Sequence, residues 1–447
     1  MAQHSQDKRP VVVILGGGFG GAYCAQTLRR ELRRGEADIL LIDRQNHFVF
    51  YPLLVEAGTG SLQPRHTVVS IRAFLRGGTF RMAEVTGLDT KNRRVQYRQP
   101  GTGECGTIVY DRLVVACGSA PNLPQVPGLR RHAFGVKSIA DVVALRDHAV
   151  QMLELADATP ALRLRRALLR FVVVGANFTG VEVAGEFCAF LKEATRAYAN
   201  VWPDDVSVTL VELSDRILGA LDEDLARYAT AQLQRCGIDL RLNESVAGIA
   251  ADGVVLRSGD RLEARTVVWC AGIAPSPVVS SLGFPTDERG YILTGRDLRV
   301  PGFEDVWAIG DCAVNPGPDG RPYPATAQHA VRQGTHAAKD IARSLRGLPA
   351  RPCDIASAGS LAALGCRTAV AKVFGLKLSG FVAWWLYRTV YLLKMPGPAR
   401  KIRVALDWTL DLLFPREYVA LGVHRRAEQA EAQSAERSTP EPAAVRG

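Results

Sequence analysis

Two glycine-rich segments have the residue types and spacing that bind dinucleotide phosphates. The first, Gly16-Gly17-Gly18-Phe19-Gly20-Gly21, fits G-x-G-x-x-G and follows the apolar run Val11–Leu15 directly. In this motif the first glycine permits a tight turn, the second lets a pyrophosphate approach the backbone, and the third lets the following helix pack closely. Asp43 stands twenty-two residues beyond the last glycine and would accept hydrogen bonds from ribose hydroxyls. The segment predicts a dinucleotide site at a helix N-terminus.

The second segment is Gly175-Ala176-Asn177-Phe178-Thr179-Gly180, with Glu212 in the place that corresponds to Asp43. Asn177 replaces the middle glycine. Asparagine tolerates positive φ better than most residues, but its side chain would occupy space that a pyrophosphate could use. The carboxylate of Glu212 favours NADH because it would repel the 2′-phosphate of NADPH, and the nearby Arg216 could weaken that preference.

Two dinucleotide sites in one chain can hold a flavin and a nicotinamide, which together suffice for hydride transfer. Gly310-Asp311 follows a further apolar run and offers a carboxylate and a helix N-terminus to the ribityl and phosphate groups of a flavin. The sequence therefore predicts an FAD-dependent enzyme that takes a hydride from a nicotinamide dinucleotide.

The elements that position these residues form two similar units. Each unit consists of a strand, a glycine-rich turn, a helix and a second strand. Each unit closes with a further strand that ends near a glycine, Gly118 in the first and Gly272 in the second. A last strand precedes Asp311, and a helix is expected from Thr326 to Leu345. The expected strands are Val11–Leu15, Ile39–Asp43, Arg112–Ala116, Phe171–Val174, Val206–Glu212, Thr266–Cys270 and Asp305–Ile309, and the expected helices end near Leu32 and Tyr198.

Composition limits the classes of protein that fit. A chain of 447 residues suggests two or three domains. Its nine cysteines are scattered without metal-site spacing, so no metal is expected and a reducing compartment fits. Only ten residues precede the first apolar run, and they include charged residues rather than an apolar h-region, so we expect no signal peptide. The apolar stretch Leu378–Leu393 contains Arg388 and is shorter than the roughly 20 residues that span a membrane, so a transmembrane helix is disfavoured.

These motifs together resemble the type II NADH dehydrogenases, the single-subunit NADH:quinone oxidoreductases, from about Pro10 to Gly422. The resemblance rests on the first glycine segment with Asn46-His47-Phe48 and Tyr51-Pro52-Leu53-Leu54, on Tyr110–Ser119, on Val172–Glu186 and on Pro324–Gly334. Asn177 and Phe178 depart from the Gly and Pro that are usual in the family. The resemblance implies an α/β fold with two Rossmann-like domains, for non-covalent FAD and for NADH, plus a C-terminal amphipathic membrane-binding region.

The resemblance also implies site residues. Gln328 and Gln333 would lie near the quinone head group, where an amide can donate a hydrogen bond without adding charge. Glu182, which we expect in the first turn of its helix, would take part in proton delivery. The FAD ligands would be Gly16–Gly21, Asp43, Arg44, Val85, Gly118, Asp311 and Ala327, and the NADH ligands Gly175, Asn177, Thr179, Gly180, Glu182, Glu212 and Gly272.

The basic C-terminal region is similar to the membrane-binding region of that family. Residues 351–426 contain 12 Lys/Arg against 4 Asp/Glu, and Trp384-Trp385 and Trp408 are interleaved among them. Interfacial aromatic residues beside cations favour an anionic phospholipid surface over nucleic acid. We therefore expect a peripheral enzyme on the cytoplasmic face of the cell membrane that pumps no protons, and a homodimer is compatible with the resemblance.

The expected domain organisation follows from the order of the two units. Residues 10–165 and 289–350 would form the FAD-binding domain in two parts, 166–288 the NADH-binding domain, 351–424 the membrane-associated region and 425–447 a disordered tail.

Two other functions stay open from the residues alone. A sulfide:quinone oxidoreductase would need two cysteines across the flavin, for which Cys312 with Cys353 or Cys366 are candidates by number. A non-turnover flavoprotein that binds NADH as a sensor or scaffold would be compatible with the substitution at Asn177. A disulfide reductase is disfavoured because no CxxxxC pair follows the first unit.

Overall fold

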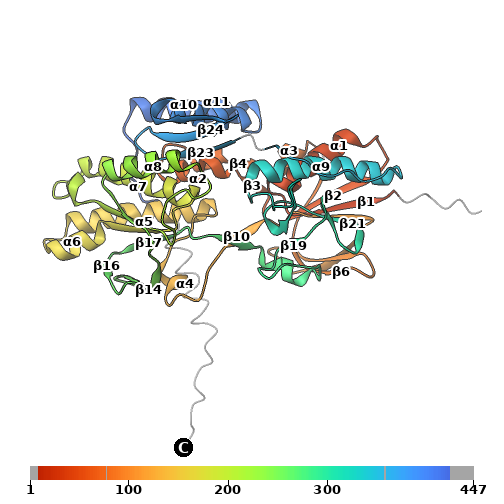
Figure 1. Cartoon of the computed structure of the whole chain (residues 1–447), viewed down its shortest axis with the longest axis horizontal. Coiled ribbons are helices and arrows are strands. Elements are labelled where there is room, and N and C mark those ends of the chain that lie inside the picture. Colours follow the sequence, from red (N-terminus) through yellow and green to blue (C-terminus); the bar gives the residue numbers. More distant parts are fainter. Residues whose placement is uncertain (1–8, 77, 357–358, 423–447) are drawn as a thin grey trace, which may run out of the picture.

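The computed structural model describes residues 9–76, 78–356 and 359–422. Two α/β units lie side by side, and the C-terminal region, drawn in blue, lies mainly above the unit drawn in yellow and green (Figure 1). The predicted α/β class with two Rossmann-like units is confirmed. The predicted tail 425–447 lies outside the described residues.

The first unit is built on a six-stranded sheet. Its β-branched, buried strands pair in parallel, except that the edge strand β20 is antiparallel to β21. Helices α1 (Phe19–Glu31) and α9 (Ala327–Leu345) pack closely at Gly334. A Cβ on Gly334 would stand 2.2 Å from the carbonyl oxygen of Gly20, so the close approach requires glycine there. The strand order is β20 (Arg299–Val300), β21 (Phe303–Ala308), β9 (Arg112–Val115), β1 (Val11–Leu15), β2 (Asp38–Asp43) and β5 (Thr79–Met82).

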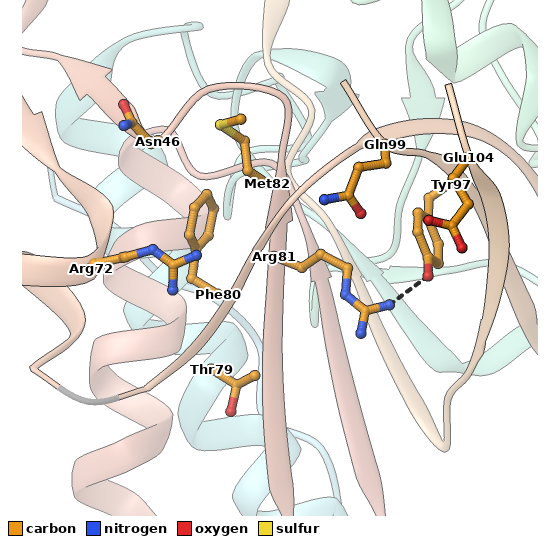
Figure 2. A pocket seen from close by; sticks show the side chains of 9 residues that line it. All are labelled: Asn46, Arg72, Thr79, Phe80, Arg81, Met82, Tyr97, Gln99 and Glu104. Atoms are coloured by element: carbon orange, nitrogen blue, oxygen red, sulfur yellow. Dashed lines mark hydrogen bonds between the residues drawn. The ribbon is translucent and has the colours of Figure 1, made fainter. Parts of the chain in front are cut away.

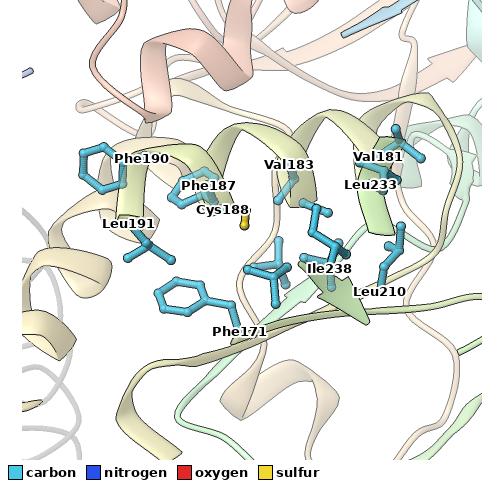
Figure 3. Close-up of a cluster of buried hydrophobic side chains, with 14 of the residues drawn as sticks. Phe171, Val181, Val183, Phe187, Cys188, Phe190, Leu191, Leu210, Leu233 and Ile238 are labelled. Carbon is cyan, nitrogen blue, oxygen red and sulfur yellow. The ribbon is translucent and has the colours of Figure 1, made fainter. Parts of the chain in front are cut away.

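The second unit is built on a four-stranded parallel sheet. Helix α7 (Phe178–Ala194) buries Phe187, Phe190 and Leu191 against this sheet (Figure 3). Helix α5 (Ile139–Asp157) packs in the same hydrophobic core. The predicted boundary between the FAD-binding and NADH-binding domains near residue 165 stays a prediction. The strand order is β13 (Ile238–Arg241), β12 (Ser207–Val211), β11 (Arg170–Val174) and β17 (Thr266–Trp269), with α6 (Leu162–Leu168) and α8 (Glu223–Arg235) beside them.

Short strands and helices complete the two units. The two chain segments that connect them pair as an antiparallel ribbon, β10 (Ser119–Pro121) with β18 (Ile273–Pro275). Each unit also carries a three-stranded meander. The meanders are β6 (Glu84–Asp89), β7 (Arg94–Arg98), β8 (Cys105–Val109) and β14 (Val246–Ala250), β15 (Gly253–Leu256), β16 (Arg261–Glu263); smaller elements are β3 (His47–Val49), β4 (Val68–Ser70), β19 (Ile292–Leu293), β22 (Ala313–Val314), α2 (Leu54–Gly58), α3 (Ile71–Leu75), α4 (Leu129–His132) and the 3₁₀ turn η6 (Gly310–Cys312).

The C-terminal region begins with a three-stranded antiparallel sheet that the sequence did not predict. Its alternation is short and interrupted by glycines, so it gives a weak strand pattern. Two helices follow, and their inner residues Trp384, Tyr387 and Trp408 join the core of the first unit. Among the described residues, no helix is both long and apolar enough to cross a bilayer. The elements are β23 (Gly359–Ala363), β24 (Ala369–Val373), β25 (Leu376–Ser379), α10 (Gly380–Lys394) and α11 (Pro398–Leu413).

Candidate functional site

The first glycine turn has the geometry that the motif predicts. Gly16 has φ +99°, and a Cβ there would stand 2.2 Å from the carbonyl oxygen of Ala116. A Cβ on Gly21 would stand 1.9 Å from the carbonyl oxygen of Gly16. A Cβ on Gly18 would meet no atom within 4 Å, so the protein itself does not require a glycine there. The open space at Gly18 is what a pyrophosphate approaching the backbone would need.

Asp43 ends β2 and holds the first glycine turn. One of its carboxylate oxygens accepts a hydrogen bond from the Gly17 N–H at 2.6 Å, and the other accepts one from the Gln45 N–H at 2.7 Å. Burial raises the pKa of this carboxyl, and the two backbone hydrogen bonds oppose that shift. The carboxylate is therefore fixed beside the turn, with lone pairs left for ribose hydroxyls.

The second glycine turn repeats this arrangement. Glu212 accepts hydrogen bonds from the Ala176 N–H at 2.6 Å and the Ser214 N–H at 2.9 Å. Gly175 has φ +96°, and a Cβ on Gly180 would stand 1.8 Å from the carbonyl oxygen of Gly175. Asp43 and Glu212 thus each accept two backbone hydrogen bonds, one from the residue after the first glycine of the turn and one from the residue two positions after the acid itself.

Asn177 has a negative φ, so the tolerance of asparagine for positive φ is not needed at this position. Its φ is −73° and its ψ −174°, an extended conformation open to any residue. Its Oδ1 accepts from the Gly180 N–H at 3.1 Å, and its Nδ2 donates to the Cys270 carbonyl at 2.7 Å. Asn177 is therefore the N-cap of α7, and its side chain is held toward its own helix and β17.

Asp311 lies in η6 within a polar cluster that the sequence did not reveal. Its carboxylate accepts a hydrogen bond from the Ser119 hydroxyl at 3.1 Å, and Lys137 donates to that hydroxyl at 3.0 Å. The Lys137 ammonium stands 5.0 Å from the ring centre of Tyr51, and burial lowers the pKa of this lysine. Burial, followed by the charge of Asp311, raises the pKa of Tyr51 to about 12. A half-buried cation beside Asp311 suits a group with negatively charged phosphates.

Most of the other predicted FAD and NADH ligands lie in or next to the glycine turns, the closing strands and the helices that follow them. Phe19 packs its ring against Phe48 and Phe50, and Arg44 is exposed after β2. Gly118 and Gly272 have φ +66° and +85° after the closing strands. Gly17 and Gly20 lie in the first turn and α1, Thr179 in α7, Val85 in β6 and Ala327 at the start of α9. Their binding roles stay predictions.

The strand β23 brings Glu182 and Gln328 into one region. Gln328 donates through Nε2 to the carbonyl of Gly359, the first residue of β23, at 3.2 Å. Glu182 accepts from the N–H of Ala363, the last residue of β23, at 3.4 Å. The two contacts are four residue steps apart, or roughly 13 Å at about 3.3 Å per step.

Gln333 faces a different element. Its side-chain oxygen accepts a hydrogen bond from the Gly310 N–H at 2.8 Å, and the residue is buried. Its amide therefore anchors the η6 turn that carries Asp311. A contact of Gln333 with a quinone stays a prediction.

Glu182 is the fifth residue of α7, just after the first turn in which it was predicted, so it is not an N-terminal dipole partner. Burial raises its pKa to about 8, against opposing hydrogen bonds with Ala363 and Tyr387. The Tyr387 hydroxyl donates to the carbonyl of Pro52 at 2.5 Å, which links α10 to the start of α2. A partly buried carboxyl with a pKa near neutrality can hold a proton and release it.

A buried ionic network that the sequence did not predict joins the C-terminal helices to both units. Arg388 lies 3.7 Å from Glu56 and 3.5 Å from Asp411, and its guanidinium stacks on Trp384 and Trp408. Trp408 donates its indole N–H to Glu56 at 2.6 Å. The network continues through Arg416, 3.0 Å from Asp411 and 4.0 Å from Glu186. The only sequence signal was a charge, Arg388, inside an apolar helix.

A cavity of about 720 Å³ opens beside the first unit, between β5 and the meander β6–β8. Figure 2 shows Arg81 donating to the Tyr97 hydroxyl, at 2.7 Å, across part of it. None of the predicted FAD ligands lines this cavity, so it is separate from the glycine turn.

The cysteines do not form the pair that sulfide oxidation would need. Cys312 is buried in η6, where its thiol donates to the carbonyl oxygens of Ile309 and Val115. Cys353 is buried, and Cys366 lies against Cys236 in the second unit. Cys353 belongs to a different hydrophobic cluster from Cys312, so neither candidate for partnership shares the surroundings of Cys312.

Comparison with known proteins assigns the family. Residues 10–334 match the model of the pyridine nucleotide-disulphide oxidoreductases, and residues 358–417 match that of the NDH2 C-terminal domain. A demethylphylloquinone reductase of Synechocystis is 32% identical, with 90% of this chain and 96% of that protein covered. A type II NADH:quinone oxidoreductase of Mycobacterium tuberculosis is 30% identical, with 92% and 89% covered.

A solved structure agrees with this assignment at the level of the fold. NDH2 from Plasmodium falciparum in complex with NADH superposes with a TM-score of 0.83 at 20% identity, covering 92% of this chain and all of that one. The chain belongs to the pyridine nucleotide-disulphide oxidoreductases and, among them, to the type II NADH dehydrogenase family.

Proposed function

We propose that this protein oxidises NADH and passes two electrons through bound FAD to a membrane quinone. The observation that carries the proposal is the pair of matched turns, each with a carboxylate fixed by two backbone N–H groups, at Asp43 and Glu212. Relatives named as NADH:quinone oxidoreductases over most of the chain support the same reaction.

The first unit fits FAD. The space at Gly18 and the positive end of α1 suit a pyrophosphate, and Asp43 suits the ribose of the adenosine. Asp311, Ser119 and Lys137 would hold the ribityl and phosphate end. When bound, FAD supplies a centre that accepts a hydride and delivers electrons to a second substrate.

The second unit fits NADH. Glu212 stands where the ribose of the adenosine would lie, and a carboxylate there opposes the extra phosphate of NADPH. Arg216 lies four positions after Glu212 and is half-buried, with its guanidinium donating to the Gly219 carbonyl at 3.0 Å. We infer a preference for NADH that the Arg216 charge reduces.

The ends of β23 provide the residues for quinone chemistry. Glu182 would deliver a proton from its carboxyl, whose pKa of about 8 keeps it protonated at neutral pH. Gln328, held against Gly359, would donate a hydrogen bond to a quinone carbonyl. The Gln333 amide would act through the η6 turn.

The exposed faces of α10 and α11 support docking on an anionic phospholipid surface. Helix α11 exposes large apolar side chains at intervals of three or four residues, α10 exposes Phe381, Trp385 and Leu393, and the β24–β25 turn adds Phe374, which is 87% exposed. Cations flank the same surface. We define this lipid face by Phe374, Leu376, Phe381, Trp385, Leu393, Ile402, Leu406, Leu410 and Leu413, with Lys394 and Arg403 beside them. Such a face enters the headgroup and acyl boundary without spanning it.

The cytoplasmic face of the membrane and a homodimer remain parts of this proposal. Nine free cysteines suit a reducing compartment.

Anaerobic stopped-flow spectroscopy tests the electron path. The purified flavoprotein is mixed with NADH and then with a short-chain quinone, and flavin absorbance is followed. Bleaching by NADH and recovery with quinone is the expected result. Bleaching without recovery would contradict the acceptor, and absence of bleaching would favour the sensor. Bleaching by sulfide but not by NADH would favour the sulfide enzyme.

A further inference from the structure

Two thiols from distant parts of the chain meet at the surface of the second unit. Cys236 is the C-cap residue of α8, and Cys366 lies in the turn between β23 and β24. Their Sγ atoms stand 3.5 Å apart although 130 positions separate them in sequence. Cys236 is half-buried and Cys366 exposed, so small oxidants can reach the pair.

The turn that presents Cys366 has an unusual backbone. Cys366 and Arg367 have φ +49° and +57°, and the Thr368 N–H donates to the Gly365 carbonyl at 3.0 Å. Turns with positive φ at both central residues favour asparagine and glycine. Packing on α7 fixes the turn, because a Cβ on Gly365 would stand 2.3 Å from the carbonyl oxygen of Gly185. The Cys366 thiol is therefore held in place by a rigid support.

The surroundings of Cys236 favour its thiolate. The hydrogen bond with Cys366 and then the charge of Lys192 lower the pKa of Cys236 to about 7, although burial opposes them. Lys192 also donates to the Cys236 carbonyl at 2.7 Å. A third thiol, Cys188, is buried, and burial raises its pKa to about 11, so it stays protonated. Cys236 is thus the nucleophile of the group.

We propose that Cys236 and Cys366 are a modification site, at which a peroxide converts the two thiols into a reversible intrachain disulfide. The Cys236 thiol releases its proton to solvent, the thiolate attacks a peroxide oxygen, and the O–O bond breaks. The departing hydroxide takes up a proton from solvent, so that a sulfenic acid and one water form. The Cys366 sulfur then attacks the Cys236 sulfur, the S–O bond breaks, and a second water leaves. Two electrons pass from the sulfurs to the peroxide, and a dithiol reverses the step.

The disulfide would fasten the C-terminus of α8 to the C-terminal sheet, to which ion pairs already join its N-terminus. At its N-terminus, Asp222 already pairs with Lys372 at 2.8 Å and with Lys377 at 2.9 Å. At its C-terminus, the sulfurs need to approach from 3.5 Å to about 2 Å. Oxidation would therefore lock the second unit to β23–β25, the sheet that also contacts Glu182.

Peptide mapping of the full-length flavoprotein tests the proposal. The protein is treated with a small excess of hydrogen peroxide, its free thiols are alkylated, and a non-reduced digest is analysed by mass spectrometry. The expected result is a peptide that links Cys236 to Cys366, a loss of two free thiols, and recovery of both with dithiothreitol.

Two variants sharpen the result. Cys366→Ser should leave Cys236 as a sulfenic acid that dimedone labels, whereas Cys105→Ser, which removes another exposed thiol, should leave the crosslink unchanged. The proposal is overturned if Cys236 and Cys366 remain alkylated while Cys105 oxidises, or if Cys236 links to Cys188 instead.

Discussion

The carboxylate of Glu182 accepts a hydrogen bond at 3.4 Å from the backbone N–H of Ala363, a residue 181 positions further along the chain. Through this contact the nucleotide-binding helix α7 is joined to the first strand of the C-terminal sheet. The opposite end of that strand holds Gln328. The proposed proton donor and the proposed quinone ligand are therefore positioned by one strand.

Replacing Glu182 with glutamine should change the pH profile of quinone reduction. Burial raises the pKa of Glu182 to about 8, so the wild-type carboxyl holds its proton below pH 8 and loses it above. The reoxidation rate of reduced flavin by quinone should fall as pH rises through 8. In Glu182→Gln the rate should be roughly 100-fold lower and independent of pH in that range. Rapid-mixing measurements between pH 6 and pH 9.5 would show both effects.

The matched control is Glu223→Gln, which removes an exposed carboxylate of α8. This variant should keep the wild-type profile. A wild-type profile in Glu182→Gln would remove Glu182 from proton delivery.

Arg388→Met should destabilise the protein without altering either glycine turn. It would leave Glu56 and Asp411 buried without their shared cation, which costs about 3–5 kcal/mol for a broken buried pair. The cost should appear as a lower denaturant midpoint. Arg227→Met, which breaks only the exposed pair with Glu223, should leave the midpoint nearly unchanged. Equal midpoints for the two variants would contradict a stabilising role of the network.

The glycine turns could be predicted from the sequence because their determinants are local. A strand, a glycine triplet and an acidic residue at fixed spacing specify the turn around Gly16, and the structure shows Asp43 bonded to it. The strand Val11–Leu15 was predicted with its observed bounds, because a short β-branched run is unambiguous.

The rest of the site depends on contacts that spacing does not reveal. Trp408 and Glu56 are 352 positions apart, and the presence of one does not predict the other as its hydrogen-bond partner. Lys137 reaches Ser119 only because the chain between them returns to the ribbon of β10 and β18. Position in a motif also did not reveal that Asn177 caps α7 with φ −73°. Such cross-chain partners require the fold.

Asn177→Gly should retain NADH oxidation, whereas Asn177→Ala should lower stability. Alanine removes the cap on the Gly180 N–H, which costs about 1 kcal/mol, while glycine at an N-cap costs only a few tenths. Because the side chain faces its own helix and Cys270, its removal should leave the KM for NADH within about twofold. Steady-state kinetics and thermal denaturation measure the two effects. A large fall in KM for Asn177→Gly would show that the side chain obstructs the coenzyme.

Glu212→Gln should raise the use of NADPH relative to NADH. Removal of one carboxylate charge beside the 2′-phosphate should shift the ratio of kcat/KM by about tenfold, or about 1.4 kcal/mol. Arg216→Ala should shift the ratio the other way. Comparing both coenzymes with one quinone tests this, and an unchanged ratio in both variants would place the 2′-hydroxyl elsewhere.

Polar substitutions on the lipid face should release the protein from anionic vesicles. Phe381 and Trp385 are 61% and 59% exposed on one side of α10, and insertion of such side chains into the acyl boundary contributes about 1.5–3 kcal/mol each. The double variant Phe381→Ser with Trp385→Ser should therefore bind phosphatidylglycerol vesicles at least tenfold more weakly in co-sedimentation, while NADH still bleaches its flavin. Trp202→Ser removes a 65% exposed aromatic residue of the second unit and should bind like the wild type. If all three proteins sediment equally, the membrane is bound through another surface.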